Sequence, residues 1–346
     1  MPSPVDLRSD TVTKPTPEMR EVMAKAPVGD DVFGEDPSIN ALQEKAADLL
    51  GLEAALFVPS GTMANQIAIK VLTRPGDEVI LEVGSHPFNF ESGAAAVISS
   101  VQLRTLTGKR GLLEPEQFER AIRPDDIHYT PTRAFCLENT HNRGGGSIYP
   151  FEMVAAVRKL ADAHGIVMHL DGARIFNACV ATGLKPADYA QYFETVAFCL
   201  SKGLGAPVGS IIAGDKAIIK EALRWRKVFG GAMRQAGILA AAGIYALDHN
   251  VDRLAEDHAN ARFLAQRLAE LDGIEIDPAE VETNIIIFKI THPRLNAPEL
   301  TERLKAREVL VLPVSPDSIR AVTHLNVDRK GVERALETIK MVIKES

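Results

Sequence analysis

Short apolar segments alternate with longer amphipathic segments through the first two thirds of the chain. Strands are predicted from Ala54 and at 78–81, 101–106, 134–137, 166–170, 196–201 and 210–214. Helices are predicted at 17–26, 36–51, 60–71, 90–97, 114–122 and 151–164. Strands that alternate with helices at this spacing indicate a parallel or mixed sheet that is covered on both faces. The sequence therefore predicts the α/β class.

The last third of the chain has a different pattern. A helix rich in alanine and glycine is predicted at 233–248, followed by a helix, strands at 285–288, 309–312 and 319–323, and a last helix from Lys330. We expect an N-terminal arm at 1–15, a large domain at 16–249 and a small α+β domain at 250–346, because a chain of 346 residues is long for one core.

Composition excludes several classes of protein. The net charge is −7 and lysines and arginines form no run, which disfavours nucleic acid and anionic lipid as partners. No apolar run reaches membrane-spanning length, and the first residues lack a signal-peptide core, so we expect a cytoplasmic protein. The cysteines, Cys136, Cys179 and Cys199, are far apart in apolar surroundings. We expect buried thiols and no metal site.

Lys202 lies where the apolar segment 196–201 ends and a glycine-rich turn begins. Open α/β sheets hold their ligands at the carboxyl ends of their strands. A lysine that is partly desolvated there loses its proton near neutral pH and attacks a carbonyl carbon, which gives a Schiff base. An isolated lysine is more often a solvated side chain, so this interpretation depends on what the other strand ends carry.

Two further segments favour a functional role for Lys202. Asp171 leaves the strand at 166–170 as Lys202 leaves its own, and an ionised aspartate keeps a pyridine nitrogen protonated. Ser60, Gly61 and Thr62 join a strand to a helix, where free N–H groups and the helix dipole suit a phosphate. Together these features predict a site for pyridoxal 5'-phosphate.

The segment GLGAPVG after Lys202 does not indicate a dinucleotide site. Its spacing is GxGxxxG, Pro207 would break the required helix start, and a strand follows where a helix is needed. Binding of NAD is therefore not supported.

The chain resembles the L-threonine aldolases, which belong to fold type I of the pyridoxal-phosphate enzymes. The resemblance rests on DLRSDTVT (6–13), APVGDDVFGEDP (26–37), SGTMAN (60–65), LENTHNRGG (137–145), HLDGARIFNA (169–178), LSKGLGAPVGS (200–210), RWRKVFGGAMRQAGILAAAGIYAL (224–247) and RAVTHLNV (320–327). It implies a large domain with a mostly parallel seven-stranded sheet covered by helices, and a smaller C-terminal α+β domain.

The resemblance also implies roles for individual residues. Lys202 corresponds to the lysine that binds the cofactor covalently, Asp171 to the partner of the pyridine nitrogen, and His86 to the imidazole that stacks on the ring. The remaining cofactor contacts implied are Gly61, Thr62, Ser201, Arg174, Lys227 and Arg234. The residues implied for the substrate carboxylate are Ser9, Arg174 and Arg320. His128 corresponds to a second active-site histidine, and the basic residues near the site belong to positions that a neighbouring subunit completes in this family.

The activity implied is cleavage of the Cα–Cβ bond of L-threonine, L-allo-threonine and related L-β-hydroxy-α-amino acids, which yields glycine and an aldehyde. The base that removes the β-hydroxyl proton is His86, His128 or a water that they position. A homotetramer with active sites between subunits is implied as well. The family usually has a longer aromatic-rich segment after the stacking histidine, whereas this chain has PFNFESGAAAV with Pro87, which restricts the backbone there.

Two alternatives stay open on the sequence alone. Another fold type I enzyme, an aminotransferase or a β-eliminating lyase, would release a keto acid from substrates without a β-hydroxyl. A non-catalytic cofactor-binding protein would bind the cofactor and release no aldehyde from threonine.

Overall fold

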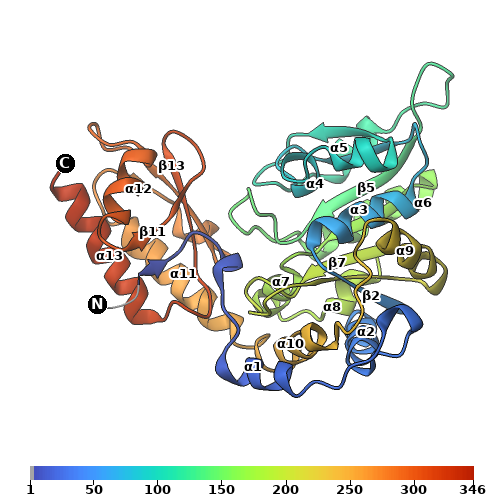
Figure 1. Cartoon of the computed structure of the whole chain (residues 1–346). Coiled ribbons are helices and arrows are strands. Elements are labelled where there is room, and N and C mark those ends of the chain that lie inside the picture. The colour runs from blue at the N-terminus through green and yellow to red at the C-terminus, as the bar shows by residue number, and fades with distance from the viewer. Residues whose placement is uncertain (1–3) are drawn as a thin grey trace.

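The computed structural model describes residues 4–346, and its centre is a seven-stranded sheet (Figure 1). The strands lie in the order β2 (Ala54–Val58), β8 (Ser210–Gly214), β7 (Thr195–Cys199), β6 (Val167–Asp171), β5 (Thr132–Glu138), β3 (Glu78–Glu82) and β4 (Gln102–Leu106). Strand β8 runs antiparallel to both of its neighbours, and the remaining pairs are parallel. The expected mostly parallel sheet is confirmed.

Helices cover both faces of this sheet. One face packs on the first apolar core, which includes side chains from α1 (Pro17–Ala24), α2 (Pro37–Leu50), α5 (Pro115–Ala121), α6 (Phe151–His164), α7 (Ile175–Thr182), α8 (Pro186–Ala190) and α10 (Gly237–His249). The other face packs on α3 (Gly61–Leu72) and α9 (Lys216–Val228). Because both faces are covered, β3, β7 and β8 are buried along their whole length.

The ends of the helices follow from local sequence. The Asp36 carboxylate accepts the N–H groups of Ser38 and Ile39 at the start of α2, and Pro37 occupies the first helical position. Gly51 ends this helix with φ of 63°, a backbone conformation that favours glycine. Ser60 caps α3 by accepting the N–H of Met63. These caps fix where β2 ends and α3 begins, beside the predicted phosphate site.

The C-terminal part is a separate α+β unit with its own apolar core. Its antiparallel four-stranded sheet has the order β12 (Leu312–Pro313), β13 (Ser318–Val322), β10 (Ile285–Ile290) and β9 (Ile274–Glu275). The helices of this unit are α11 (Leu254–Leu268), η4 (Pro278–Glu280), α12 (Ala297–Lys305) and α13 (Arg329–Lys344). A smaller C-terminal domain is thus present, as the sequence predicts, while the residue boundaries proposed above stay a prediction.

The N-terminal arm connects the two domains, and residues 1–3 of the expected arm lie outside the described residues. Strand β1 (Val5–Asp6) pairs in parallel with β11 (Val309–Leu310) of the small domain. The chain then forms the 3-10 turn η1 (Asp10–Val12) and reaches the large domain at α1, as the dark blue segment of Figure 1 shows. A second 3-10 turn, η2 (Asp31–Phe33), precedes α2.

The helix predicted at 90–97 is wrong. The structure has instead a short α4 (His86–Asn89) and a π-helical turn, η3 (Ala95–Ser99). Ser92 and Gly93 lie between them with φ of 54° and 71°, values that a right-handed helix does not accommodate.

Two further predictions are tested by the structure. Cys136, Cys179 and Cys199 are free and buried, which confirms the expected buried thiols. The chain turns directly from β7 into β8 after Lys202, so the helix required by a dinucleotide motif is absent from this described segment. Within residues 4–346, we find no helix that combines the length and the apolar character needed to cross a membrane.

Candidate active site

A cavity of about 360 Å³ opens at the carboxyl ends of the central strands, where the large domain, the small domain and the arm meet. It contains most of the predicted site residues, namely Ser9, Gly61, His86, Asp171, Arg174, Lys202 and Arg320. These residues come from segments that are distant in the sequence. The fold therefore brings them to one pocket.

Asp171 and Lys202 lie at the ends of neighbouring strands, as their spacing predicts. Asp171 is the last residue of β6 and is 3% exposed. Its Oδ1 accepts the N–H of Ala173 at 3.1 Å, and its Oδ2 accepts the side-chain amide of Asn65 at 2.8 Å. These bonds fix a buried carboxylate in the pocket wall, where a protonated ring nitrogen would compensate its charge.

The N-terminus of α3 forms the other end of this wall. A Cβ on Gly61 would lie 2.9 Å from Cys199 Sγ and 3.7 Å from Ser210 Oγ, so only glycine leaves this space open. The Ser210 hydroxyl is buried and has no hydrogen-bond partner among residues 4–346. A phosphate at this helix start would meet free N–H groups and an unpaired hydroxyl. The residues present thus fit pyridoxal phosphate.

His86 begins α4 and is held by a buried acid. Its Nδ1 lies 2.7 Å from Oε1 of Glu91, and Glu91 also accepts amide N–H groups from Asn65 and Gln66. Burial alone would lower the pKa of His86, but the hydrogen bond to Glu91 and the charges of Asp171 and Glu91 outweigh it and raise this pKa.

Three ligand atoms of His86, Glu91 and Asp171 lie within 4.8 Å of one another, a spacing that a cation could share. The Asn65 amide group donates to both carboxylates. We therefore interpret His86, Glu91 and Asp171 as a hydrogen-bonded part of the pocket wall.

The opposite side of the pocket carries the predicted carboxylate-binding residues. Arg320 on β13 donates from Nη1 to Asn142 Oδ1 at 2.8 Å and from Nη2 to the Arg8 carbonyl at 3.1 Å. Its Nε is buried without a partner among the described residues. Burial and the nearby charge of Arg174 lower the pKa of Arg320 to about 10. An anion in the pocket would relieve this repulsion and stabilise the charged guanidinium.

Sequence reasoning missed several polar residues of the site. Glu138 ends β5 and accepts the backbone N–H groups of His86 and Asn142, both at 2.8 Å. It occupies the same strand-end position as Asp171, so the rule that found Asp171 applies to it as well. Asp10, Asn65 and Glu91 carried no comparable signal, because their importance depends on which side chains the fold places beside them.

Other predicted residues lie outside the cavity lining. Thr62 and Ser201 are half-buried neighbours of Gly61 and Lys202. His128 lies on the exposed segment between α5 and β5, which projects from the large domain in Figure 1, and its side chain is 79% exposed. Lys227 is an exposed residue in the last turn of α9, and Arg234 pairs with Asp30 at 2.9 Å. None of these three joins the pocket of its own chain.

The doubly covered sheet and its strand-end lysine and aspartate define an α/β enzyme of pyridoxal-phosphate fold type I. The chain belongs to the beta-eliminating lyase family, whose model matches residues 6–291.

Known proteins of similar sequence or fold agree with this assignment. The low specificity L-threonine aldolase of Escherichia coli is 46% identical over 327 residues, which cover 94% of this chain and 95% of that protein. Low-specificity L-threonine aldolase 1 of Arabidopsis thaliana is 41% identical over 344 residues, covering 98% and 96%. The structure of Leishmania major threonine aldolase has a TM-score of 0.84 at 20% identity and covers 99% of this chain and 100% of its own. The resemblance inferred from the motifs is confirmed.

Proposed function

We propose that this protein is a pyridoxal-phosphate-dependent lyase that cleaves L-threonine, L-allo-threonine and related L-β-hydroxy-α-amino acids to glycine and an aldehyde. The observation that carries the proposal is one pocket that contains Lys202, the buried Asp171 and two arginines, Arg174 and Arg320. The Nε–H of Arg320 has no hydrogen-bond partner among the described residues. The names of the similar proteins support the same reaction.

The large domain would hold the cofactor. Lys202 would bind its carbonyl carbon covalently, Asp171 would face the ring nitrogen, and the start of α3 with Gly61 and Thr62 would hold the phosphate. When bound, pyridoxal phosphate supplies an electron sink for the bond that breaks at Cα. We further propose that Ser201, Arg174, Lys227 and Arg234 contribute to cofactor binding, the last two from a neighbouring subunit.

Ser9, Arg174 and Arg320 would bind the substrate carboxylate. A planar guanidinium matches a carboxylate with two parallel hydrogen bonds, so it fixes both position and rotation. Held in this way, the substrate keeps its Cα–Cβ bond in one orientation, and the orientation determines which bond breaks. The hydroxyl of Ser9 accepts the N–H of Thr11 at 3.2 Å, which positions the oxygen at the pocket wall.

The β-hydroxyl proton needs an acceptor, and we assign this role to His86 within the chain's own pocket. Its Nδ1 is bound to Glu91, which leaves Nε2 for proton transfer. Only the neutral imidazole accepts a proton, and the pKa of His86 is raised. Turnover should therefore rise as the pH increases through this raised value.

The direct test measures acetaldehyde and glycine from L-threonine with purified, cofactor-loaded protein. Lys202→Ala should abolish turnover and the visible absorbance of the bound cofactor, and borohydride reduction should no longer add the cofactor's mass to the chain. Lys159→Ala, an exposed lysine on α6, is the matched control and should behave as the unsubstituted protein. A Lys202→Ala variant that retains full turnover would refute the proposal.

The family's description gives one competing reaction, β-elimination. An eliminating enzyme converts L-serine to pyruvate and ammonia, whereas aldol cleavage of serine gives glycine and formaldehyde. Measuring both product pairs from serine in parallel separates the two reactions. Pyruvate as the dominant product would favour elimination.

We also propose a homotetramer in which His128, Lys227 and Arg234 complete the pocket of a neighbouring subunit. The support is their exposure, together with apolar neighbours that face outward: Ile127 is 97% exposed and Val228 is 68% exposed. Exposed apolar side chains of this kind are typical of surfaces that subunit contacts cover. The free thiols fit a reducing compartment, and we propose the cytoplasm.

Mixing two impaired variants tests the shared site. Lys202→Ala and His128→Asn proteins should each be impaired, and their mixed oligomers should regain activity, because some pockets then receive both intact residues. Unmixed proteins at the same concentrations are the control. Complete absence of recovery in mixed oligomers, confirmed by mass, would mean that His128 does not act across subunits.

A further inference from the structure

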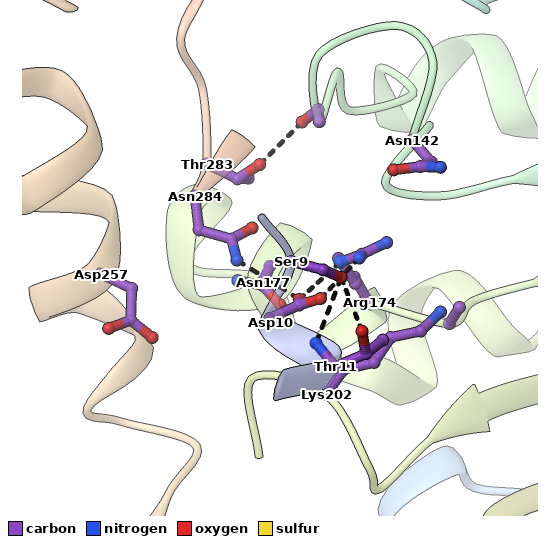
Figure 2. Close-up of polar contacts among 12 residues, drawn as sticks. Ser9, Asp10, Thr11, Asn142, Arg174, Asn177, Lys202, Asp257, Thr283 and Asn284 are labelled. Atoms are coloured by element: carbon purple, nitrogen blue, oxygen red, sulfur yellow. Dashed lines mark hydrogen bonds and ion pairs between the residues drawn. The ribbon is translucent and has the colours of Figure 1, made fainter. Parts of the chain in front are cut away.

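Asp10 on the N-terminal arm forms a paired contact with Arg174. The Nε of Arg174 donates to Oδ2 of Asp10 at 2.6 Å, and Nη2 donates to Oδ1 at 2.7 Å. The Asp10 side chain is fully buried, and that of Arg174 is 6% exposed. Figure 2 shows the two side chains facing each other beside Ser9 and Lys202. The arm thus places a carboxylate directly behind the pocket's arginine.

This contact uses only one edge of the guanidinium. Arginine carries five N–H groups in a plane, and Asp10 takes the Nε–H and one of those on Nη2. The outer edge, formed by Nη1 and the second N–H of Nη2, stays available for a carboxylate in the pocket that Arg174 lines. Asp10 therefore fixes the direction in which the free edge points.

The Asp10–Arg174 ion pair also makes the two arginines of the pocket differ in charge compensation. Burial would raise the pKa of Asp10, but the charge and hydrogen bonds of Arg174 hold this pKa far below its ordinary value. Both groups are therefore charged, and together they are neutral. Arg320 has no carboxylate partner within hydrogen-bond distance among the described residues, so its positive charge is not compensated by an ion pair.

Contacts on both sides of Asp10 hold the arm in place. Before it, the Leu7 carbonyl accepts the N–H of Val322 of the small domain at 2.8 Å. After it, the Thr13 hydroxyl donates to the Lys202 carbonyl of the large domain at 2.9 Å. Asn284 of the small domain approaches Oδ2 of Asp10 at 3.4 Å. Asp10 lies at the point where the arm passes from one domain to the other.

We propose that Asp10 is a positioning residue: it holds Arg174 so that the free edge of the guanidinium receives the substrate's α-carboxylate, while Arg320 contributes a positive charge without an ion-pair partner. The identity of the ligand rests on the function proposed above. The positioning itself follows from the contacts of Asp10 and requires only that an amino-acid carboxylate binds in this pocket.

The test is binding of glycine to cofactor-loaded Asp10→Asn protein, followed by the change in visible absorbance. Ethanolamine, an amine without a carboxylate, is the comparison ligand. We expect glycine to bind about 10- to 100-fold more weakly, by analogy with the loss that follows when residues that orient metal ligands are changed. The affinity for ethanolamine should be unaltered. In turnover assays, KM for threonine should rise more than kcat falls.

Asp257→Asn provides a matched control. Asp257 is a buried carboxylate on α11 that makes a paired contact with Arg253 at 2.9 and 2.7 Å, and it stands apart from the Asp10 cluster in Figure 2. It does not line the pocket. Loss of a buried ion pair is thus common to both variants, and only Asp10→Asn should change the affinity for glycine. Equal weakening in both would show a general structural effect and overturn the proposal.

A double variant keeps the test valid if Asp10→Asn does not fold. Arg174→Gln leaves the Asp10 charge near the substrate carboxylate, and Asp10→Asn/Arg174→Gln removes both charges. If Asp10 acts through Arg174, the double variant binds glycine at least as tightly as Arg174→Gln alone. A further loss in the double variant would mean that Asp10 acts independently and would overturn the proposal.

The outcomes separate this inference from the proposed reaction. Unsubstituted protein that releases no acetaldehyde from threonine, but whose glycine binding depends on Asp10, would refute the reaction and support the positioning role. Active protein in which Asp10→Asn binds glycine normally would refute the positioning role alone.

Discussion

The pocket has two walls of different origin. The cofactor wall, formed by Gly61, Asn65, Asp171 and Lys202, belongs entirely to the large domain and lies where strands end or helices begin. The carboxylate wall, formed by Ser9, Arg174 and Arg320 with Asp10 behind Arg174, comes from the arm, the start of α7 and the small domain. The first wall depends on the geometry of one sheet. The second depends on how the arm and the small domain dock onto that sheet.

This difference predicts different consequences of substitution. Changes in the cofactor wall should alter the cofactor's spectrum, its affinity or the chemical step. Changes in the carboxylate wall should alter recognition of the amino acid and leave the bound cofactor intact, except at Arg174, which we also assign to cofactor binding. Each variant below tests whether the two walls act separately.

Asp171→Asn should have the largest effect of these substitutions. The amide is nearly isosteric but cannot stabilise a protonated ring nitrogen by charge, so we expect kcat to fall by about 10²- to 10³-fold, as when one preorganised electrostatic group is removed. KM for threonine should change little. Steady-state kinetics and the visible spectrum provide the measurement. A large rise in KM with unchanged kcat would contradict the separation of the walls.

Arg320→Gln should give the converse result. Truncating one partner of a buried charge pair costs about 2–5 kcal/mol, so KM for threonine should rise at least about 30-fold. The dissociation constant of the cofactor should stay the same, because Arg320 lies on the small-domain side of the cavity. Arg303→Gln, on the outer helix α12, is the control. If Arg320→Gln also weakened cofactor binding, the two walls would not act separately.

Gly61→Ala should weaken cofactor binding through packing alone. The new Cβ would lie 2.9 Å from Cys199 Sγ, and overpacking of this kind costs about 1–3 kcal/mol. Equilibrium dialysis of the cofactor measures the loss. Gly61→Ala/Cys199→Ala removes the close contact and should recover part of the affinity. If the double variant binds no better than Gly61→Ala, the phosphate itself needs the space at Gly61.

Local sequence patterns predict the cofactor wall, whereas Ser9, Arg174 and Arg320 of the carboxylate wall are predicted only through the family resemblance, and the reason is physical. Asp171 and Lys202 follow apolar runs that form neighbouring parallel strands, and parallel strands end at one edge of the sheet. Glu138 follows from the same rule, although it was not predicted. Asp10 lies in an arm without periodicity, so nothing local indicates that it meets Arg174 from a distant segment.

The remaining differences between prediction and structure arise where the chain departs from local sequence patterns. The segment 90–97 contains apolar and alanine residues typical of a helix, but Ser92 and Gly93 adopt positive φ and divide it. This break turns Glu91 inward, where its carboxylate reaches His86. For His128 the difficulty is different. Motif position predicts a catalytic histidine there, whereas the place that we propose for it in the pocket of another chain depends on an assembly that the sequence of one chain does not describe.

Glu91→Gln should have the smallest effect on maximal turnover and a clear effect on pH dependence. Glu91 supports the charged form of His86, so the pair stabilises the fold fully below the ordinary pKa of histidine, and this contribution is lost as the pH rises through the raised pKa. Removing the Glu91 charge should lower the pKa of His86. As neutral His86 is the proposed base, the acidic limb of kcat should move to lower pH.

The measurement combines the pH profile of kcat with an NMR titration of the His86 imidazole. Both should shift in the same direction, because they report the same proton. Asp126→Asn is the matched control: its carboxylate lies 2.7 Å from Nδ1 of His128 but on the exposed segment, so the titration of His86 should not change. A shift of the imidazole pKa without any shift of the kinetic profile would exclude His86 as the base and move that role to His128 or to a bound water.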